Sequence, residues 1–222
     1  MSSKARDGFL GNKADVERLL AIHGELGGSG PGRRHGLEVL NKSAVVLITA
    51  CWEAYIEDVA AEAFDHILKN CSDASGFPTR VRVLAARSLR EAKDERKIWA
   101  LAGNGWKTVL TEHRDKTLEY FHTPKHKNVD DLFFDLLGLG NLSASWRWQG
   151  MSAKSAAKKL NNYVEIRGKV AHRVGYSTPI PKAYAEDYLK HVELLVGRTD
   201  ETVHKYAKEC SGVQPWPGSS HF

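Results

Sequence analysis

Several features of secreted, membrane and metal-binding proteins are missing from this sequence of 222 residues. Its three cysteines, Cys51, Cys71 and Cys210, lie far apart and form no CxxC pair, so neither a disulfide framework nor a thiolate zinc site is predicted. No run of about 18 apolar residues could span a membrane, and the first residues lack the apolar core of a signal peptide. We therefore expect a cytoplasmic protein that does not insert into membranes.

The motifs of several common catalytic sites are also missing. No glycine-rich phosphate loop precedes a helix, and the sequence contains neither HExxH nor a nucleophile elbow. His122 and His126 lie four residues apart, but Pro124 between them interrupts the helix that would align both on a metal ion. The sequence therefore predicts no metal site and no cofactor.

Helical periodicity, in contrast, runs through most of the chain. Residues 37–68 place apolar side chains three and four apart, and the centre of this stretch, AVVLITACW, is apolar on nearly every side. This pattern predicts a long central helix. Further helices are expected over residues 13–28, 76–104, 105–123, 152–173 and 182–210, with a short one capped by Asn128. The expected fold is all-α: one helical bundle over residues 1–211 and a flexible tail over residues 212–222.

Positive charge is concentrated late in the chain. The whole sequence has a net charge of +5, and residues 154–173 alone hold six basic residues against the single acid Glu165. The basic residues are Lys154, Lys158, Lys159, Arg167, Lys169 and Arg173. This segment predicts binding of a polyanion. A solvated helix face without a ligand is the alternative that stays open.

Arg167 precedes His172 by five residues in this basic segment, within EIRGKVAHRVG. The same spacing separates Arg18 from His23, so the spacing alone indicates little. The two copies differ in context: leucine and isoleucine fill the first, as in a helix that faces a core, whereas basic residues flank the second. Context therefore favours the second copy as a functional pair.

Three segments in this order resemble the HEPN superfamily, in particular the RiboL-PSP-HEPN group. They are VLITACWEAYIEDVAAEAF, LGLGNLSASWRWQG and KLNNYVEIRGKVAHRVG. The resemblance covers about residues 37–196 and implies that Arg167 and His172 form a metal-independent ribonuclease site, completed across a homodimer. In this family a polar residue, often Asn, typically follows the arginine, whereas this chain has Gly168.

The pair suits cleavage of RNA without a metal. A histidine can move the proton of the ribose 2′-hydroxyl or of the leaving oxygen, and a guanidinium grips phosphate oxygens. Five residues along a helix separate side chains by about 140°, so a second copy around a two-fold axis would close the site. The expected product is a 2′,3′-cyclic phosphate. The resemblance implies a toxin or anti-phage role, with an antitoxin or regulatory protein as a partner. A non-catalytic HEPN module that dimerises and binds RNA or protein is the alternative, and a plain helical scaffold is a third.

Other residues are predicted around this pair. Contacts to RNA are expected from Lys158, Lys159, Lys169, Arg173 and Arg147. Glu53 and Glu57, four apart on the central helix, repel each other unless a cation such as Arg167 lies opposite. Glu165 is expected to pair with Lys169.

Two features of the predicted site have two interpretations each. Trp146 and Trp148 flank Arg147, an arrangement suited to stacking on bases, but tryptophans beside a bundle more often anchor a loop to the core. Gly168 either leaves room for a close helix or a substrate, or it marks the loss of a supporting side chain.

Overall fold

The computed structural model describes residues 2–27, 37–172 and 179–216. Within these ranges all regular secondary structure is helical, apart from one isolated β-bridge between Trp148 and Met151. The all-α prediction is therefore confirmed. No helix in the described ranges is long and apolar enough to cross a membrane.

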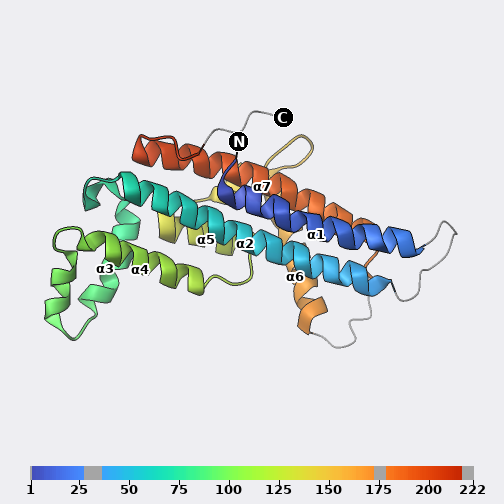
Figure 1. The fold of residues 1–222 in the computed structure, drawn as a ribbon, viewed down its shortest axis with the longest axis horizontal. Coiled ribbons are helices and arrows are strands. Elements are labelled where there is room, and N and C mark those ends of the chain that lie inside the picture. The colour runs from blue at the N-terminus through green and yellow to red at the C-terminus, as the bar shows by residue number, and fades with distance from the viewer. Residues whose placement is uncertain (1, 28–36, 173–178, 217–222) are drawn as a thin grey trace.

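Three long helices form the body of the molecule: α1 (Lys4–Gly27), α2 (Glu38–Asn70) and α7 (Lys182–Ser211). They lie side by side in Figure 1, and both α1 and α7 pack on α2. The centre of α2 is apolar on most sides, so several helices can pack around it, as expected for a buried helix. The prediction of a long central helix is confirmed.

Four shorter helices complete the fold: α3 (Thr79–Arg90), α4 (Gly105–Glu119), α5 (His126–Leu137) and α6 (Ala153–His172). Three 3-10 helices connect them: η1 (Ala74–Gly76), η2 (Glu95–Leu101) and η3 (Leu142–Ser145). In Figure 1, α3 and α4 lie at the end of the bundle where α2 finishes, and the C-terminal end of α6 projects below α2.

Several sequence predictions about helix ends are wrong: α1 begins at Lys4, before the predicted residue 13, and two further differences have a clear physical cause. The helix predicted over residues 76–104 stops at Arg90, because the Asp94 carboxylate accepts a hydrogen bond from the Arg96 amide (3.1 Å) and starts η2 instead. The following short helix begins at His126, so Asn128 is not its cap. The Asn128 amide donates to the carbonyl oxygens of His122 (3.2 Å) and Thr123 (2.8 Å).

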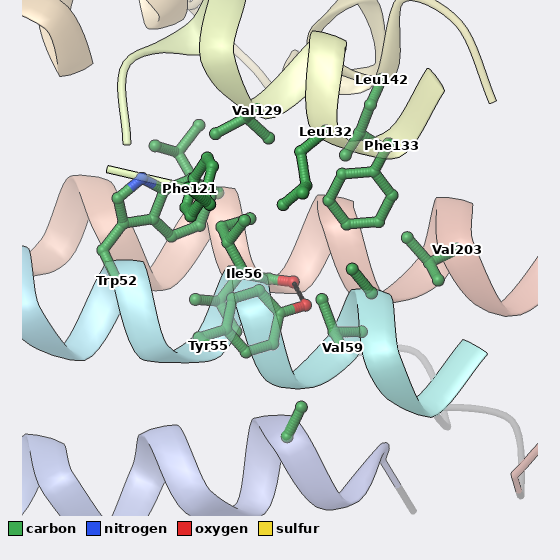
Figure 2. Packing of buried hydrophobic residues seen from close by; sticks show 14 of the residues in the cluster. Trp52, Tyr55, Ile56, Val59, Phe121, Val129, Leu132, Phe133, Leu142 and Val203 are labelled. Atoms are coloured by element: carbon green, nitrogen blue, oxygen red, sulfur yellow. Dashed lines mark hydrogen bonds between the residues drawn. The ribbon is translucent and has the colours of Figure 1, made fainter. Parts of the chain in front are cut away.

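The core lies where α2, α5 and α7 meet. In Figure 2, Trp52 of α2 lies beside Phe121, and Ile56 of α2 faces the side from which Leu132 and Phe133 of α5 point inward. These side chains are buried, and full burial of each large apolar side chain stabilises the fold by about 1.5–3 kcal/mol. This apolar core holds α2 in position, and α6 packs against α2.

Of the predicted flexible tail, residues 212–222, the structure describes residues 212–216, in which 212–214 are exposed and Trp216 is buried. Gly212 ends α7 in the left-handed conformation, and the buried Trp216 ring meets the His204 ring edge-on, with centroids 5.4 Å apart. Residues 217–222 lie outside the described residues. The chain therefore stays on the surface of α7 as far as Trp216.

Candidate functional site

Arg167 lies in the C-terminal half of α6, where this helix passes α2. Its guanidinium Nη2 is 3.5 Å from the Glu53 carboxylate, and the two side chains are 22% and 24% exposed. Glu53 is the one ion-pair partner of Arg167 within the described residues. A guanidinium has five N–H donors, and this long contact, the hydrogen bond that Arg167 makes among the described residues, uses one of them.

Glu57 lies one turn beyond Glu53 on the same face of α2. Burial raises the pKa of Glu57, as does the neighbouring Glu53 carboxylate, whereas the nearby His122 lowers it. His122 is exposed, and it comes from the segment that precedes α5. The structure therefore brings His122 close to Glu57 of α2. The sequence suggests His122 only as a metal ligand.

A strained turn positions His122. Thr123, the next residue, has a φ of 61°, a left-handed conformation that non-glycine residues rarely adopt. The Trp52 indole fastens the turn to α2 by donating to the Pro124 carbonyl oxygen (3.0 Å). The turn is therefore tied to the residue that precedes Glu53 in the chain.

The same turn is also tied to α6. The Asn161 side chain accepts a hydrogen bond from the His126 amide (3.1 Å), and its nitrogen lies 2.8 Å from Nδ1 of the same histidine. Lys125 forms an ion pair with Glu165 (2.9 Å), and this contact lowers the pKa of the Glu165 carboxyl. The predicted Glu165–Lys169 ion pair does not form. The roles of Lys125 and Asn161 were missed because nothing in the local sequence indicates which turn faces α6.

The basic residues of α6 divide into paired and unpaired groups. Lys159 forms an ion pair with Asp187 of α7 (2.8 Å), which also accepts a hydrogen bond from the Tyr163 hydroxyl (2.5 Å). Lys154, Lys158 and Lys169 are exposed. Arg173 lies outside the described residues. His172 is the last residue of α6, and its side chain is not among those described. The net charge of the segment is therefore partly compensated by acids from other helices.

The tryptophans beside Arg147 anchor their loop. Trp146 is fully buried and its indole donates to the Thr199 hydroxyl (3.0 Å), so it cannot stack on a base. Trp148 is half-buried and meets the His191 ring edge-on, 5.5 Å between centroids. Arg147 is exposed between them. The anchoring interpretation is confirmed for Trp146.

His191 fastens α6 to α7. Burial lowers its pKa to about 4, and its Nε2 lies 3.1 Å from the carbonyl oxygen of Ala156. The neutral ring donates its Nε2–H to that oxygen. α6 is thus joined to α7 by this hydrogen bond and by the contacts of Lys159 and Tyr163 with Asp187, and to α2 by Arg167.

Gly168 faces open space. A Cβ atom built on this residue would meet no neighbouring atom within 4 Å. The packing of this chain alone therefore does not require glycine at that position. The face of α2 that leads to Glu53 is open as well: Val39 is 61% exposed, Val46 is 36% exposed, and Ala50 continues the same stripe.

Within the described ranges, no cluster of three His, Cys, Asp or Glu side chains could hold a metal ion. The all-α architecture agrees with that of the HEPN superfamily. A model of the RiboL-PSP-HEPN family matches residues 12–205, so the chain belongs to this family. No curated protein and no solved structure matches the chain.

Proposed function

We propose that this HEPN protein is a metal-independent endoribonuclease in which Arg167 and His172 act on the scissile phosphate. The observation that supports the proposal is the position of Arg167, which lies in the C-terminal half of α6 and makes one long contact, to Glu53 of the central helix. A guanidinium arranged in this way fits two oxygens of a phosphodiester.

The reaction needs two proton transfers. His172 takes the proton from the ribose 2′-hydroxyl, or gives one to the leaving 5′-oxygen, and Arg167 offsets the charge that develops on the phosphorane. The 2′-oxygen bonds to phosphorus as the bond to the 5′-oxygen breaks, which leaves a 2′,3′-cyclic phosphate. The exposed Lys158, Lys169 and Arg147 contact flanking phosphates, and Lys159, being paired with Asp187, contributes less.

A second copy of the chain completes the site. Ideal helix geometry separates positions five residues apart by about 140°, so one copy of α6 is not expected to bring both residues to a single phosphate. The exposed stripe of Val39, Val46 and Ala50 beside Glu53 supplies an apolar seam, and the open space at Gly168 admits a neighbouring helix. The same proposal includes a cytoplasmic toxin or anti-phage role, with an antitoxin or other regulatory protein as a partner.

The non-catalytic alternative rests on Gly168, which replaces the polar residue typical after the arginine. Under this alternative the protein dimerises and binds RNA or a protein without cleaving it. Both functions predict binding at α6, so only a cleavage assay separates them.

The test is incubation with mixed RNA in a metal chelator, with analysis of the 3′ ends of the products. Arg167→Ala and His172→Ala are each expected to lower the rate by about a hundredfold or more, as losses of transition-state stabilisation do. Arg18→Ala is the matched control, because Arg18 precedes His23 by the same five residues. This variant should cleave at the parent rate. Unchanged cleavage in Arg167→Ala contradicts the site. Binding without cleavage by the parent favours the alternative, and a monomer at working concentration contradicts the shared site.

A further inference from the structure

A second basic segment lies away from Arg167, on the hairpin made by α3, η2 and the start of α4. Residues 79–107 hold eight basic and three acidic residues, a net charge of +5 that equals the excess of the whole chain. The basic residues are Arg80, Arg82, Arg87, Arg90, Lys93, Arg96, Lys97 and Lys107. Figure 1 shows this hairpin at one end of the long axis, well separated from the projecting end of α6.

Four of these cations are available to a partner. Arg80 is paired with Asp135 and Arg96 with Asp94, both at 2.9 Å. In contrast, Arg87, Arg90, Lys93 and Lys97 are exposed and form no ion pair within the described residues. The acids Glu91 and Glu95 of the hairpin are likewise exposed, which leaves an excess of positive charge at this surface.

The hairpin also exposes large apolar side chains. None of the residues of η2 is buried: Trp99 is 77% exposed, Ile98 is 63% exposed and Leu101 is 39% exposed. The other five tryptophans of the chain are buried or half-buried. Three exposed apolar side chains within four residues are more than the scattered single residues of an ordinary surface, so this group indicates a contact site.

The chemistry of the hairpin favours an unpaired nucleic acid strand as the partner. An exposed indole can stack on a base, and the exposed cations that precede it in the chain can follow the phosphates, which is how single strands are bound without sequence preference. The core of a protein interface is instead depleted of charged residues. We infer that the α3–η2 hairpin docks single-stranded RNA, with Trp99 stacked on a base and Arg87, Arg90, Lys93 and Lys97 along the backbone. The inference rests on the proposed function only in taking RNA as the ligand.

Binding of a short oligouridylate to the full-length Arg167→Ala variant tests the inference while the RNA stays intact. Trp99 is the most exposed tryptophan, so its fluorescence should be quenched as the RNA binds. Adding Trp99→Ala is expected to weaken binding by about tenfold or more, whereas Trp99→Phe should retain most of it. Tyr120→Ala, which removes an aromatic residue of similar exposure outside the hairpin, is the matched control and should bind as the Arg167→Ala parent does.

Salt dependence gives a second measurement. Lys97→Gln should lower the slope of log affinity against log salt concentration by about 0.7, as expected for one phosphate contact to a single strand. The inference is overturned if the oligouridylate does not bind, if Trp99→Ala binds it as tightly as the parent, or if an RNA duplex binds equally well. It is also overturned if Trp99→Ala abolishes self-association, because the surface would then face a second copy. Cleavage by the wild type with unchanged binding in Trp99→Ala overturns this inference alone, and hairpin binding without cleavage overturns only the catalytic proposal.

Discussion

Two segments of this chain carry the same net charge of +5 and use it differently. In α6, acids of other helices pair with two of the charges, Glu53 with Arg167 and Asp187 with Lys159, while Lys154, Lys158 and Lys169 stay exposed. On the α3–η2 hairpin, Asp135 pairs with Arg80 and the local Asp94 with Arg96, while four cations stay exposed in the segment that precedes Trp99. The two segments therefore differ in what accompanies the charge: α6 sets Arg167 against the central helix, whereas the hairpin combines its cations with exposed apolar side chains. The predictions below test this contrast, from the largest expected effect to the smallest.

Tryptophan removal should separate the two regions most clearly. Trp146→Ala leaves a cavity in the core and an unpaired Thr199 hydroxyl, so the free energy of unfolding should fall by about 3–5 kcal/mol. Trp99→Ala, on the hairpin, should change it by less than about 0.5 kcal/mol. Urea unfolding of both variants measures the difference. A large loss in Trp99→Ala would show that η2 is packed rather than open.

Acid should weaken the contact between α6 and α7 at His191 and should not weaken RNA binding at the hairpin. The pKa of His191 is about 4 in the folded protein, against 6.5 ordinarily, so between these values the unfolded chain binds more protons. Stability should therefore fall as the pH is lowered from about 6.5 to 4, by up to about 3 kcal/mol for this group.

The replacement His191→Gln should remove that part of the pH dependence, as measured by urea unfolding across the range. Its stability at pH 8 serves as the control for the packing that it loses. RNA binding at the hairpin, where residues 79–107 include no histidine, should not share this pH dependence. An unchanged slope in the variant would contradict the role of His191.

Replacing one aspartate by asparagine in each region compares the contribution of their ion pairs to stability. Asp187→Asn weakens the acceptor of both Lys159 and the mostly buried Tyr163, so it should lower the free energy of unfolding by about 1 kcal/mol. Asp94→Asn, in an exposed pair, should leave the unfolding midpoint unchanged. Thermal melts decide between these outcomes, and equal losses would remove the distinction between internal and local pairs.

Replacement of glycine by alanine should change the free energy of unfolding least, and the change should have opposite signs in the two regions. Gly168→Ala puts a methyl group into open space within α6 and should raise the free energy of unfolding by about 0.5–1 kcal/mol. Gly103→Ala, near the end of the hairpin, should be destabilising because its φ is +59°. Destabilisation by Gly168→Ala in unfolding experiments, at concentrations where a dimer forms, would show that a second chain occupies this space.

The fold could be predicted where one periodic pattern dominates. The unbroken apolar spacing of α2 predicts that helix, whereas the helix predicted over residues 76–104 is too long. Basic and apolar residues continue from α3 into η2, and this pattern does not show that Asp94 caps a new turn. A second count of charge over residues 79–107 would have found the hairpin segment, but exposure of Trp99 is a tertiary property that composition does not contain.

The candidate site was predictable only in part. The basic surroundings and the family resemblance predict Arg167, and the repulsion between Glu53 and Glu57 indicates a cation opposite them, from this chain or a partner chain. Lys125 and Asn161 could not be found, because their contacts depend on the left-handed Thr123 and on how its turn lies across two helices. Long-range contacts of this kind arise from the assembled bundle, not from local sequence.

Because α2 packs on both α1 and α7, the order of translation affects how the nascent chain folds. α2 can pair with α1 as soon as both have left the exit tunnel, but its other long partner, α7, follows only after residues 71–181 have been translated. Until then the apolar side of α2 that α7 covers is bare in the nascent chain. Because uncovered apolar surface favours aggregation, this interval is when the polypeptide has the greatest need of a chaperone.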